Sequence, residues 1–192
     1  MKTILFDFDQ TLTKRDTLRP FAHYLAWEFC KPMGLVLLYF VLFLARLRVL
    51  DDKRMKEFFL RIFIKAEDVS SVNSVVKKYF KIHLDSLLID RMFEVLIRYR
   101  DNGDNVFIVS ANFDFFLEPL IQLWGIDGVI CTQTQKNKGV FTGKIIGNTC
   151  KGKTKVERIR NRFSSKEISH MIAFGNRDDK ELLGLVGEGI FL

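Results

Sequence analysis

Two acidic side chains lie two residues apart where a short apolar run ends. Asp7 and Asp9 stand in the stretch "DFDQTLT", directly after residues 2–6. Side chains at alternate strand positions point the same way, so these carboxylates repel each other unless a cation lies between them. The stretch is therefore either a turn, in which Asp hydrogen-bonds to the backbone, or half of a metal site.

Polar clusters also follow two other apolar runs. Ser110 lies in "VSAN" after residues 106–109, and "GNRDD" follows residues 168–174. Ligands of a parallel α/β sheet bind at the carboxyl ends of its strands, so the three clusters can form one site. The Ser110 hydroxyl and the N–H groups of a following helix would bind phosphate oxygens. The oxygen ligands suited to a hard cation such as Mg²⁺ are Asp7, Asp9, Asn176, Asp178 and Asp179.

The elements that must position these clusters alternate between strands and helices. Apolar runs at residues 4–8, 106–109 and 168–174, with a weaker run at 129–131, predict buried strands. The helical patterns between them predict an α/β fold with a mostly parallel sheet. The stretch "NKGVFTGKIIG" alternates around Gly143 and predicts a β-hairpin.

A helical insert separates the first two strands. Asp51 or Asp52 can cap one of its helices, and a core of residues 1–16 and 98–192 would carry an all-helical cap of residues 17–97. Apolar residues recur at helical spacing in two expected stripes, Met55, Phe58, Phe59, Ile62 and Phe63, and then Val72, Val75, Val76, Tyr79 and Phe80.

The charge balance favours anionic partners. Lys and Arg outnumber Asp and Glu by 30 to 23, which gives a net charge of +7. The basic stretch at residues 136–166 lacks the interleaved aromatics of a nucleic-acid-binding surface, so we expect no nucleic-acid partner. Three widely spaced cysteines indicate a reducing compartment, and the opening residues do not form a signal peptide. These features predict a cytoplasmic protein.

Four motifs in order resemble those of a known family. "DFDQTLT", "VSAN", "CKGKTK" and "GNRDDKELL" resemble the motifs of the haloacid dehalogenase (HAD) superfamily of phosphohydrolases. The position of the helical insert is similar to that of the cap in its phosphoserine phosphatase-like branch. The resemblance covers essentially the whole chain and implies a Rossmann-like three-layer core. It also implies Mg²⁺-dependent hydrolysis of a phosphomonoester.

The resemblance assigns a role to each motif residue. Asp7 would be the nucleophile that forms an aspartyl-phosphate, and Asp9 the general acid and then the general base. Ser110 would hydrogen-bond to the transferring phosphoryl group, and Lys155 would balance its charge. The implied Mg²⁺ ligands are Asp7, the main-chain carbonyl of Asp9, Asn176 and Asp179. The implied substrate contacts are Thr11, Asp16, Ala111 and Asn112.

Two motifs depart from the family pattern. Position 10 carries Gln where the family has a small residue, often Gly, and we expect its side chain to point away from the metal. "GNRDD" is one residue shorter than the usual G-D-S-x-x-D, with Asn176 in place of the first Asp and Asp179 aligned with the second. An Asn carbonyl can still ligate Mg²⁺ with less charge, and Asp178 is the alternative ligand.

Two further assignments have an alternative. The family pattern C-x-G-x-x-K selects Lys155, but Lys151 and Lys153 lie in the same motif, and Lys153 is the nearer competitor. Asp16 stands where phosphoserine phosphatases carry an acid that meets the substrate amine. The context "RDTL" equally suits the N-cap of a helix, which is the interpretation we favour.

Residues 33–45 leave the substrate class open. They carry no charge, yet as a helix they extend only about 20 Å, short of the ~30 Å hydrocarbon layer. They form either a helix buried in the cap or a surface that contacts a membrane or an acyl chain. The C-type phosphatidylglycerophosphate phosphatases of this branch have a similarly apolar cap.

Two functions therefore follow from the sequence. The first is a phosphatase whose substrate is a phosphorylated small molecule or a lipid phosphate, with residues 33–48 as the candidate for peripheral contact at the inner face of a membrane. The alternative is a catalytically weak relative that serves as a membrane- or partner-binding module.

Overall fold

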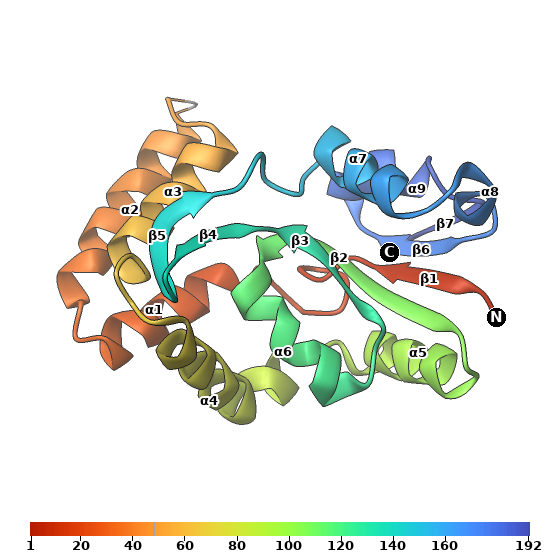
Figure 1. The fold of residues 1–192 in the computed structure, drawn as a ribbon, viewed down its shortest axis with the longest axis horizontal. Coiled ribbons are helices and arrows are strands. Elements are labelled where there is room, and N and C mark those ends of the chain that lie inside the picture. Colours follow the sequence, from red (N-terminus) through yellow and green to blue (C-terminus); the bar gives the residue numbers. More distant parts are fainter. Residues whose placement is uncertain (48) are drawn as a thin grey trace.

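A sheet with helices on both sides forms the centre of the molecule (Figure 1). The computed structural model describes residues 1–47 and 49–192. Its strands are β1 (Thr3–Phe6), β2 (Asn105–Phe113), β3 (Gly128–Thr132), β4 (Thr134–Asn137), β5 (Val140–Ile145), β6 (Ile172–Gly175) and β7 (Glu188–Phe191). Its helices are α1 (Leu18–Glu28), α2 (Pro32–Arg46), α3 (Asp52–Phe63), α4 (Val69–Leu87), α5 (Asp90–Asp101), α6 (Asp114–Trp124), α7 (Lys153–Arg162), α8 (Ser165–Ile168) and α9 (Lys180–Leu183). A short 3₁₀ turn, Arg177–Asp179, precedes α9.

The sheet has the order β3-β2-β1-β6-β7, and neighbouring strands are parallel. Side chains of a strand alternate between its two faces. Ile4 and Phe6 of β1 therefore pack into the core cluster that includes residues of α5 and α6, whereas Leu5 packs into the cluster that includes Ile159 of α7 and Leu182 of α9. This three-layer arrangement confirms the expected α/β core with a mostly parallel sheet.

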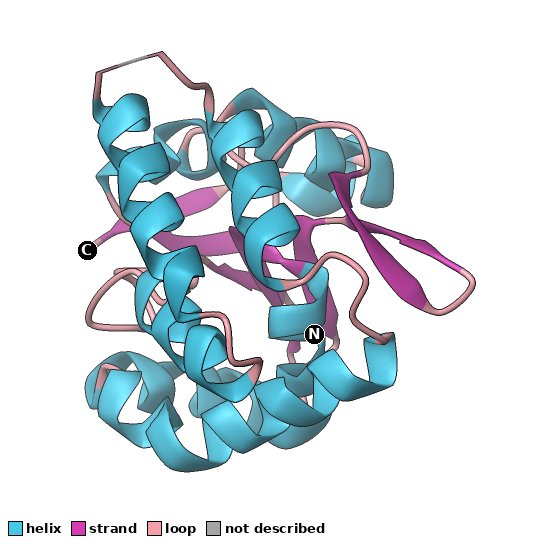
Figure 2. Ribbon diagram, turned by 90° about the vertical axis from the view of Figure 1, so that its left-hand side faces the viewer, coloured by secondary structure: helices cyan, strands magenta, loops and turns pink. Residues whose placement is uncertain are grey.

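The helices between β1 and β2 confirm the expected all-helical insert. Figure 2, which views the molecule from the side of this insert, shows helices standing in front of the strands. The stripe predicted for α4 is buried from Val72 to Phe80. The stripe predicted for α3 is shifted: Lys56, Phe59, Leu60 and Phe63 are its buried residues, because the helix turns this side toward the sheet and the hairpin.

The β4–β5 hairpin packs on the helical insert. Its bend lies at Lys138 and Gly139 rather than at Gly143. The N–H of Ala66 donates to the carbonyl of Phe141 at 3.0 Å, and the N–H of Phe141 donates to the carbonyl of Glu67 at 3.1 Å. The hairpin, which follows the core strand β3, is thereby hydrogen-bonded to the loop between α3 and α4.

Three predicted strands need correction, and one strand was missed. The strand predicted at residues 4–8 covers only Thr3–Phe6. The run at residues 168–174 does not form one strand, because Ile168 ends the short helix α8 and β6 begins at Ile172. The strand predicted at residues 106–109 extends to Phe113, so Ser110 lies inside β2 rather than after it. The edge strand β7 was not predicted, since its four residues include Gly189 and lack a clear apolar alternation.

The second boundary of the expected core–cap division falls inside a helix. Residue 97 lies within α5, which packs against β2 of the sheet. The division into residues 1–16 with 98–192 and residues 17–97 stays a prediction. Among the described residues, no helix has the length and apolar character needed to cross a bilayer.

Candidate active site

A cavity of about 610 Å³ opens at the carboxyl ends of β1, β2 and β6. Asp7 follows β1 directly, Ser110 and Asn112 lie near the end of β2, and Asn176 follows β6. Because the strands are parallel, these ends meet at one edge of the sheet, as the three polar clusters predicted. Helix α3 closes part of the cavity with Met55 and other residues.

Lys155 bridges two buried carboxylates. Its Nζ lies 2.8 Å from Oδ1 of Asp7 and 2.6 Å from Oδ1 of Asp179. Burial raises the pKa of Asp7 to about 6, although the charge of Lys155 opposes the shift. Burial alone would lower the pKa of Lys155, but the two carboxylates outweigh it and raise that pKa. The two carboxylates therefore keep Lys155 protonated.

The geometry distinguishes the three candidate lysines. Lys155 is buried in the first turn of α7 and reaches the cavity. Lys153 is exposed, and Lys151 forms an exposed ion pair with Asp178 at 3.3 Å. The arrangement supports Lys155 as the motif lysine and leaves Asp178 at the rim.

Asp9 is held by the start of the helical insert. Its Oδ1 accepts hydrogen bonds from the N–H of Thr17 at 2.9 Å and from the Thr17 hydroxyl at 2.7 Å. The amide of Asn112 lies 3.5 Å from Oδ2. Burial, followed by the charge of Asp16, raises the pKa of Asp9 to about 7. Asp9 can therefore carry or release a proton near neutral pH.

Two oxygens converge on the Asn176 side chain. Its Nδ2 donates to the main-chain carbonyl of Asp9 at 3.0 Å and lies 3.4 Å from Oδ2 of Asp7. A carboxylate and a carbonyl that face one point form part of an oxygen site for Mg²⁺. If the side-chain amide of Asn176 is flipped, its oxygen takes the place of its nitrogen and supplies a third oxygen ligand at this point. These residues fit a magnesium ion.

Asp179 is placed differently from the other implied metal ligands. Its Oδ1 contacts Lys155, and its Oδ2 accepts from the N–H of Asn176 at 3.1 Å. A Cβ on Gly175 would lie 2.8 Å from the Cβ of Asp179, so glycine is needed for this close approach. Among the described residues, no three Asp, Glu, His or Cys side chains form a metal cluster. In this conformation Asp179 positions Lys155.

The remaining predicted site residues line the cavity or contact residues that line it. The Oδ1 of Asp16 accepts from the N–H groups of Leu18 and Arg19 at 3.1 and 3.3 Å, so Asp16 caps the start of α1 while lining the cavity. Thr11 is buried, with its hydroxyl 3.5 Å from the Asn176 amide. Gln10 has φ of +61°, a conformation that favours glycine at this position.

Hydrogen bonds fix the side chains of Ser110 and Asn112 near the end of β2. The Ser110 hydroxyl oxygen accepts from the N–H of Asn112 at 3.1 Å, and the Asn112 amide donates to the Thr17 hydroxyl at 2.9 Å. The hydroxyl hydrogen of Ser110 is thus available to a phosphate oxygen. Ala111 contributes its carbonyl, which accepts from Lys56 and from the Thr132 hydroxyl.

Lys56 is a cavity residue that the sequence prediction missed. It comes from α3, is 6% exposed, and donates to the carbonyl of Ala111. Burial lowers the pKa of Lys56, and Asp52 opposes this shift. The signal in the sequence is its spacing, since Lys56 precedes the buried Phe59 and Leu60 by three and four residues.

Comparisons with known proteins agree with this arrangement. The chain is 28% identical over 190 residues to Protein CicA of Caulobacter vibrioides, covering 96% of this chain and 83% of that protein. The fold matches a protein of unknown function from Bordetella pertussis with a TM-score of 0.87 and 20% identity, over 100% of this chain and 90% of that one. A substrate-bound phosphoserine phosphatase has the same fold, with a TM-score of 0.64 and 18% identity over 99% and 85% of the two chains.

The family assignment follows from a sequence match that covers all of the candidate site residues. The sequence model of haloacid dehalogenase-like hydrolases matches residues 4–179, which include β1, the helical insert, the lysine of α7 and Asp179. The fold is that of the phosphoserine phosphatase-like members. The chain therefore belongs to the haloacid dehalogenase-like hydrolases.

Proposed function

We propose that the protein hydrolyses phosphomonoesters through an aspartyl-phosphate on Asp7, with Mg²⁺ as cofactor. The observation that carries this proposal is the meeting of Asp7, Asp9, Ser110 and Lys155 at one cavity, from four separate parts of the chain. Three free cysteines support a reducing, cytoplasmic setting.

The proposed reaction has two steps. A carboxylate oxygen of Asp7 bonds to phosphorus while the bond to the leaving oxygen breaks, and Asp9 gives that oxygen a proton. Water then attacks the phosphorus, gives its proton to Asp9, and the bond to Asp7 breaks. Ser110 and Lys155 would hold the phosphoryl oxygens, which suits a reaction that depends on positioning and charge neutralisation.

Mg²⁺ would be held by Asp7, the main-chain carbonyl of Asp9 and Asn176, with Asp179 as a further proposed ligand. The convergence of the Asp7 and Asp9 oxygens on Asn176 supports this placement. When bound, the ion would neutralise charge on the phosphate group. Asn176 brings no negative charge, so we expect the affinity for Mg²⁺ to be low.

Removal and return of the metal test the proposed activity. Treatment with EDTA should abolish phosphate release from p-nitrophenyl phosphate, and excess Mg²⁺ should restore it, because the site needs a cation beside the phosphate. Release would be followed colorimetrically across a Mg²⁺ titration. Absence of turnover at every Mg²⁺ concentration would instead support the catalytically weak binding module.

Lys56 should matter for substrate binding. Lys56→Met keeps the length of the side chain but removes the charge that faces the cavity, so kcat/KM for phosphomonoesters should fall by about 10- to 100-fold. Most of the loss should lie in KM. Thermal unfolding should show only a small destabilisation, about 1 kcal/mol, because the variant loses the hydrogen bond to the Ala111 carbonyl but no longer has to desolvate a buried charge.

Lys53→Met is the matched control on the same helix. Lys53 does not border the cavity among its described lining residues, so its replacement should leave kcat/KM unchanged. Equal losses in the two variants would mean that α3 acts only through its overall charge.

A lipid phosphate is a second candidate substrate because an apolar crevice adjoins the cavity. A hollow of about 100 Å³ is lined by apolar residues of α2 and α3, including Leu38, Leu42, Met55 and Phe59, together with Asp16, Arg19 and Lys56. It is too small for a whole acyl chain, so its apolar side would contact only the carbons nearest the phosphate. A screen of phosphorylated metabolites against lysophosphatidic acids would separate the two classes by kcat/KM.

A further inference from the structure

Helix α2 turns an apolar side away from the protein. Six side chains at spacings of three and four residues form this side, which we call the α2 face: Met33, Val36, Leu37, Phe40, Phe43 and Leu47. Each is between 54% and 72% exposed. Of the two alternatives for residues 33–45, a helix buried on all sides is therefore wrong, since only one side is buried. A contiguous exposed apolar surface of this kind marks an interaction site.

The opposite side of α2 is fixed to the protein. Its buried residues are Gly34, Leu38 and Val41. A Cβ on Gly34 would lie 2.7 Å from Ile62 of α3, which shows how closely the two helices approach. The α2 face cannot turn inward without losing this packing. It is a fixed surface feature of the fold.

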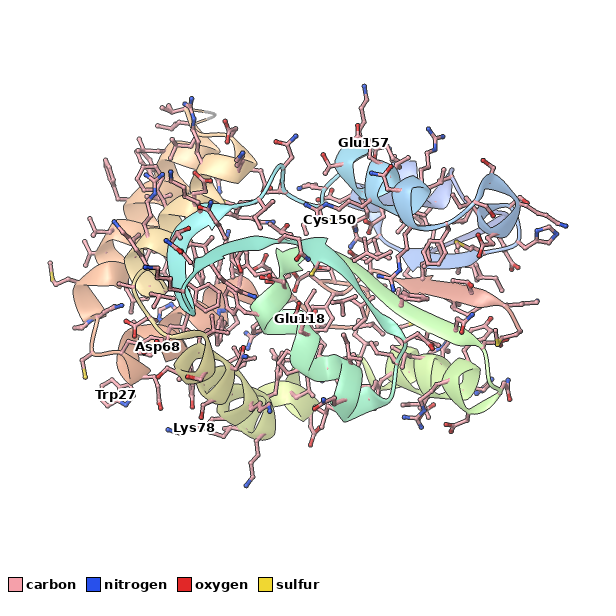
Figure 3. The ribbon with its side chains drawn as sticks, in the orientation of Figure 1. Trp27, Asp68, Lys78, Glu118, Cys150 and Glu157 are labelled. Carbon is pink, nitrogen blue, oxygen red and sulfur yellow. The ribbon has the colours of Figure 1, made fainter. Side chains whose placement is uncertain are left out.

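Aromatic side chains lie near the α2 face. Trp27 is 86% exposed at the end of α1, and Figure 3 shows it at the outer edge of the molecule. Tyr39 of α2 is hydrogen-bonded to His23 of α1 at 2.8 Å. Aromatic side chains at such borders are typical of surfaces that lie at a lipid–water boundary.

The segment around α2 contains basic but no acidic residues. Residues 29–50 contain no acidic residue, and their basic residues are Lys31, Arg46 and Arg48. Lys31 is paired with Glu67 at 2.6 Å, so it is neutralised. Arg46 is exposed at the carboxyl end of α2, and Arg48 lies outside the described residues. The segment that carries the apolar face thus has an excess of positive charge.

We propose that the α2 face docks the protein on the surface of an anionic lipid bilayer, with α2 lying in the plane of the interface. The apolar side chains would enter the boundary between headgroups and acyl chains, and Arg46 would meet lipid phosphates. The helix has 15 residues, which extend about 22 Å and do not span a bilayer. Docking is independent of the proposed hydrolysis.

A second copy of the chain is the less favourable occupant. A twofold interface places the same patch on both partners. It would bring two segments together that have no acidic residue between Phe29 and Leu50. The acids that flank this segment, Glu28, Asp51 and Asp52, are already paired with Lys78, Arg54 and Lys56. Anionic lipid instead complements this charge.

Vesicle flotation with matched variants tests the docking. The wild-type protein should float with vesicles of phosphatidylcholine and phosphatidylglycerol and much less with phosphatidylcholine alone. Phe40→Asp should lower the bound fraction by about tenfold or more, because it replaces an apolar ring that would enter the bilayer by a charge that anionic lipid repels. Leu123→Asp on α6 is the control, since Leu123 and Phe40 are equally exposed at 58%. Asp7→Asn should float like the wild type, which separates docking from turnover.

Three results would overturn the proposal. The first is absence of flotation with the anionic vesicles. The second is an equal loss of binding in Leu123→Asp and Phe40→Asp. The third is a dimer, seen by analytical ultracentrifugation, that Phe40→Asp dissociates while neither protein binds vesicles.

Discussion

Asp7→Asn should lower phosphate release from p-nitrophenyl phosphate by about 10⁴-fold or more, because an amide nitrogen does not attack phosphorus as a carboxylate does. The substitution keeps the size of the side chain. It also leaves Asp179 beside Lys155 at 2.6 Å, so the lysine keeps one buried anionic partner. The measurement is steady-state phosphate release at saturating Mg²⁺, with thermal unfolding to show that the fold is retained.

Asp85→Asn is a suitable control for this variant. Asp85 is an exposed aspartate of α4, far from the strand ends in sequence. Its replacement makes the same chemical change and should leave turnover at the wild-type level. Turnover that persists in pure Asp7→Asn would assign the nucleophile to another residue.

Lys155→Met should cost about 3–5 kcal/mol of unfolding free energy, which is typical of a buried charge left without its partner. Asp7 and Asp179 have side chains that are 8% and 4% exposed, and Lys155 contacts both. Without the lysine, two buried carboxylates would face each other. Urea unfolding followed by circular dichroism measures the loss, and turnover should fall with it. Lys153→Met, an exposed change on the same helix, should be close to neutral.

The loss in Lys155→Met should depend on pH. Burial raises the pKa of Asp7 to about 6 even with Lys155 present, and removing the lysine charge raises it further. An acid whose pKa is higher in the folded state than in the unfolded state destabilises the fold as pH rises through the folded value. The deficit of the variant should therefore be smaller at pH 5 than at pH 8. A deficit that does not change between these pH values would mean that packing, not charge, explains it.

The candidate site could be predicted because strand ends of one parallel sheet meet at one edge. Asp7, Ser110 and Asn176 each follow or end an apolar run, and their separation in sequence does not matter once the strands are parallel. The assignment of Lys155 was harder. The family pattern favours it over Lys153, and the fold adds that Lys155 is buried in α7 whereas Lys153 is exposed.

What the sequence did not reveal depends on tertiary packing. Helix α3 has apolar residues around much of its circumference, so which side is buried, and with it the place of Lys56, depends on the neighbouring hairpin. The exposure of the α2 face also depends on where neighbouring helices lie. By contrast, the error at residues 168–174 was avoidable, because Ser164 and Glu167 form a capping box that marks a helix start.

The hairpin of β4 and β5 changes how the helical insert could move. The hairpin follows the core strand β3 in the chain, yet its main chain is hydrogen-bonded to Ala66 and Glu67 of the insert. A rigid-body rotation of the insert alone would break these bonds. The hairpin is also fixed to the core, because the Thr134 hydroxyl donates to Oδ1 of Asp114 in α6 and Nζ of Lys136 lies 3.2 Å from Oδ2 of the same residue. A hairpin that followed the insert would break these contacts instead, so residues 134–145 couple the position of the insert to that of α6.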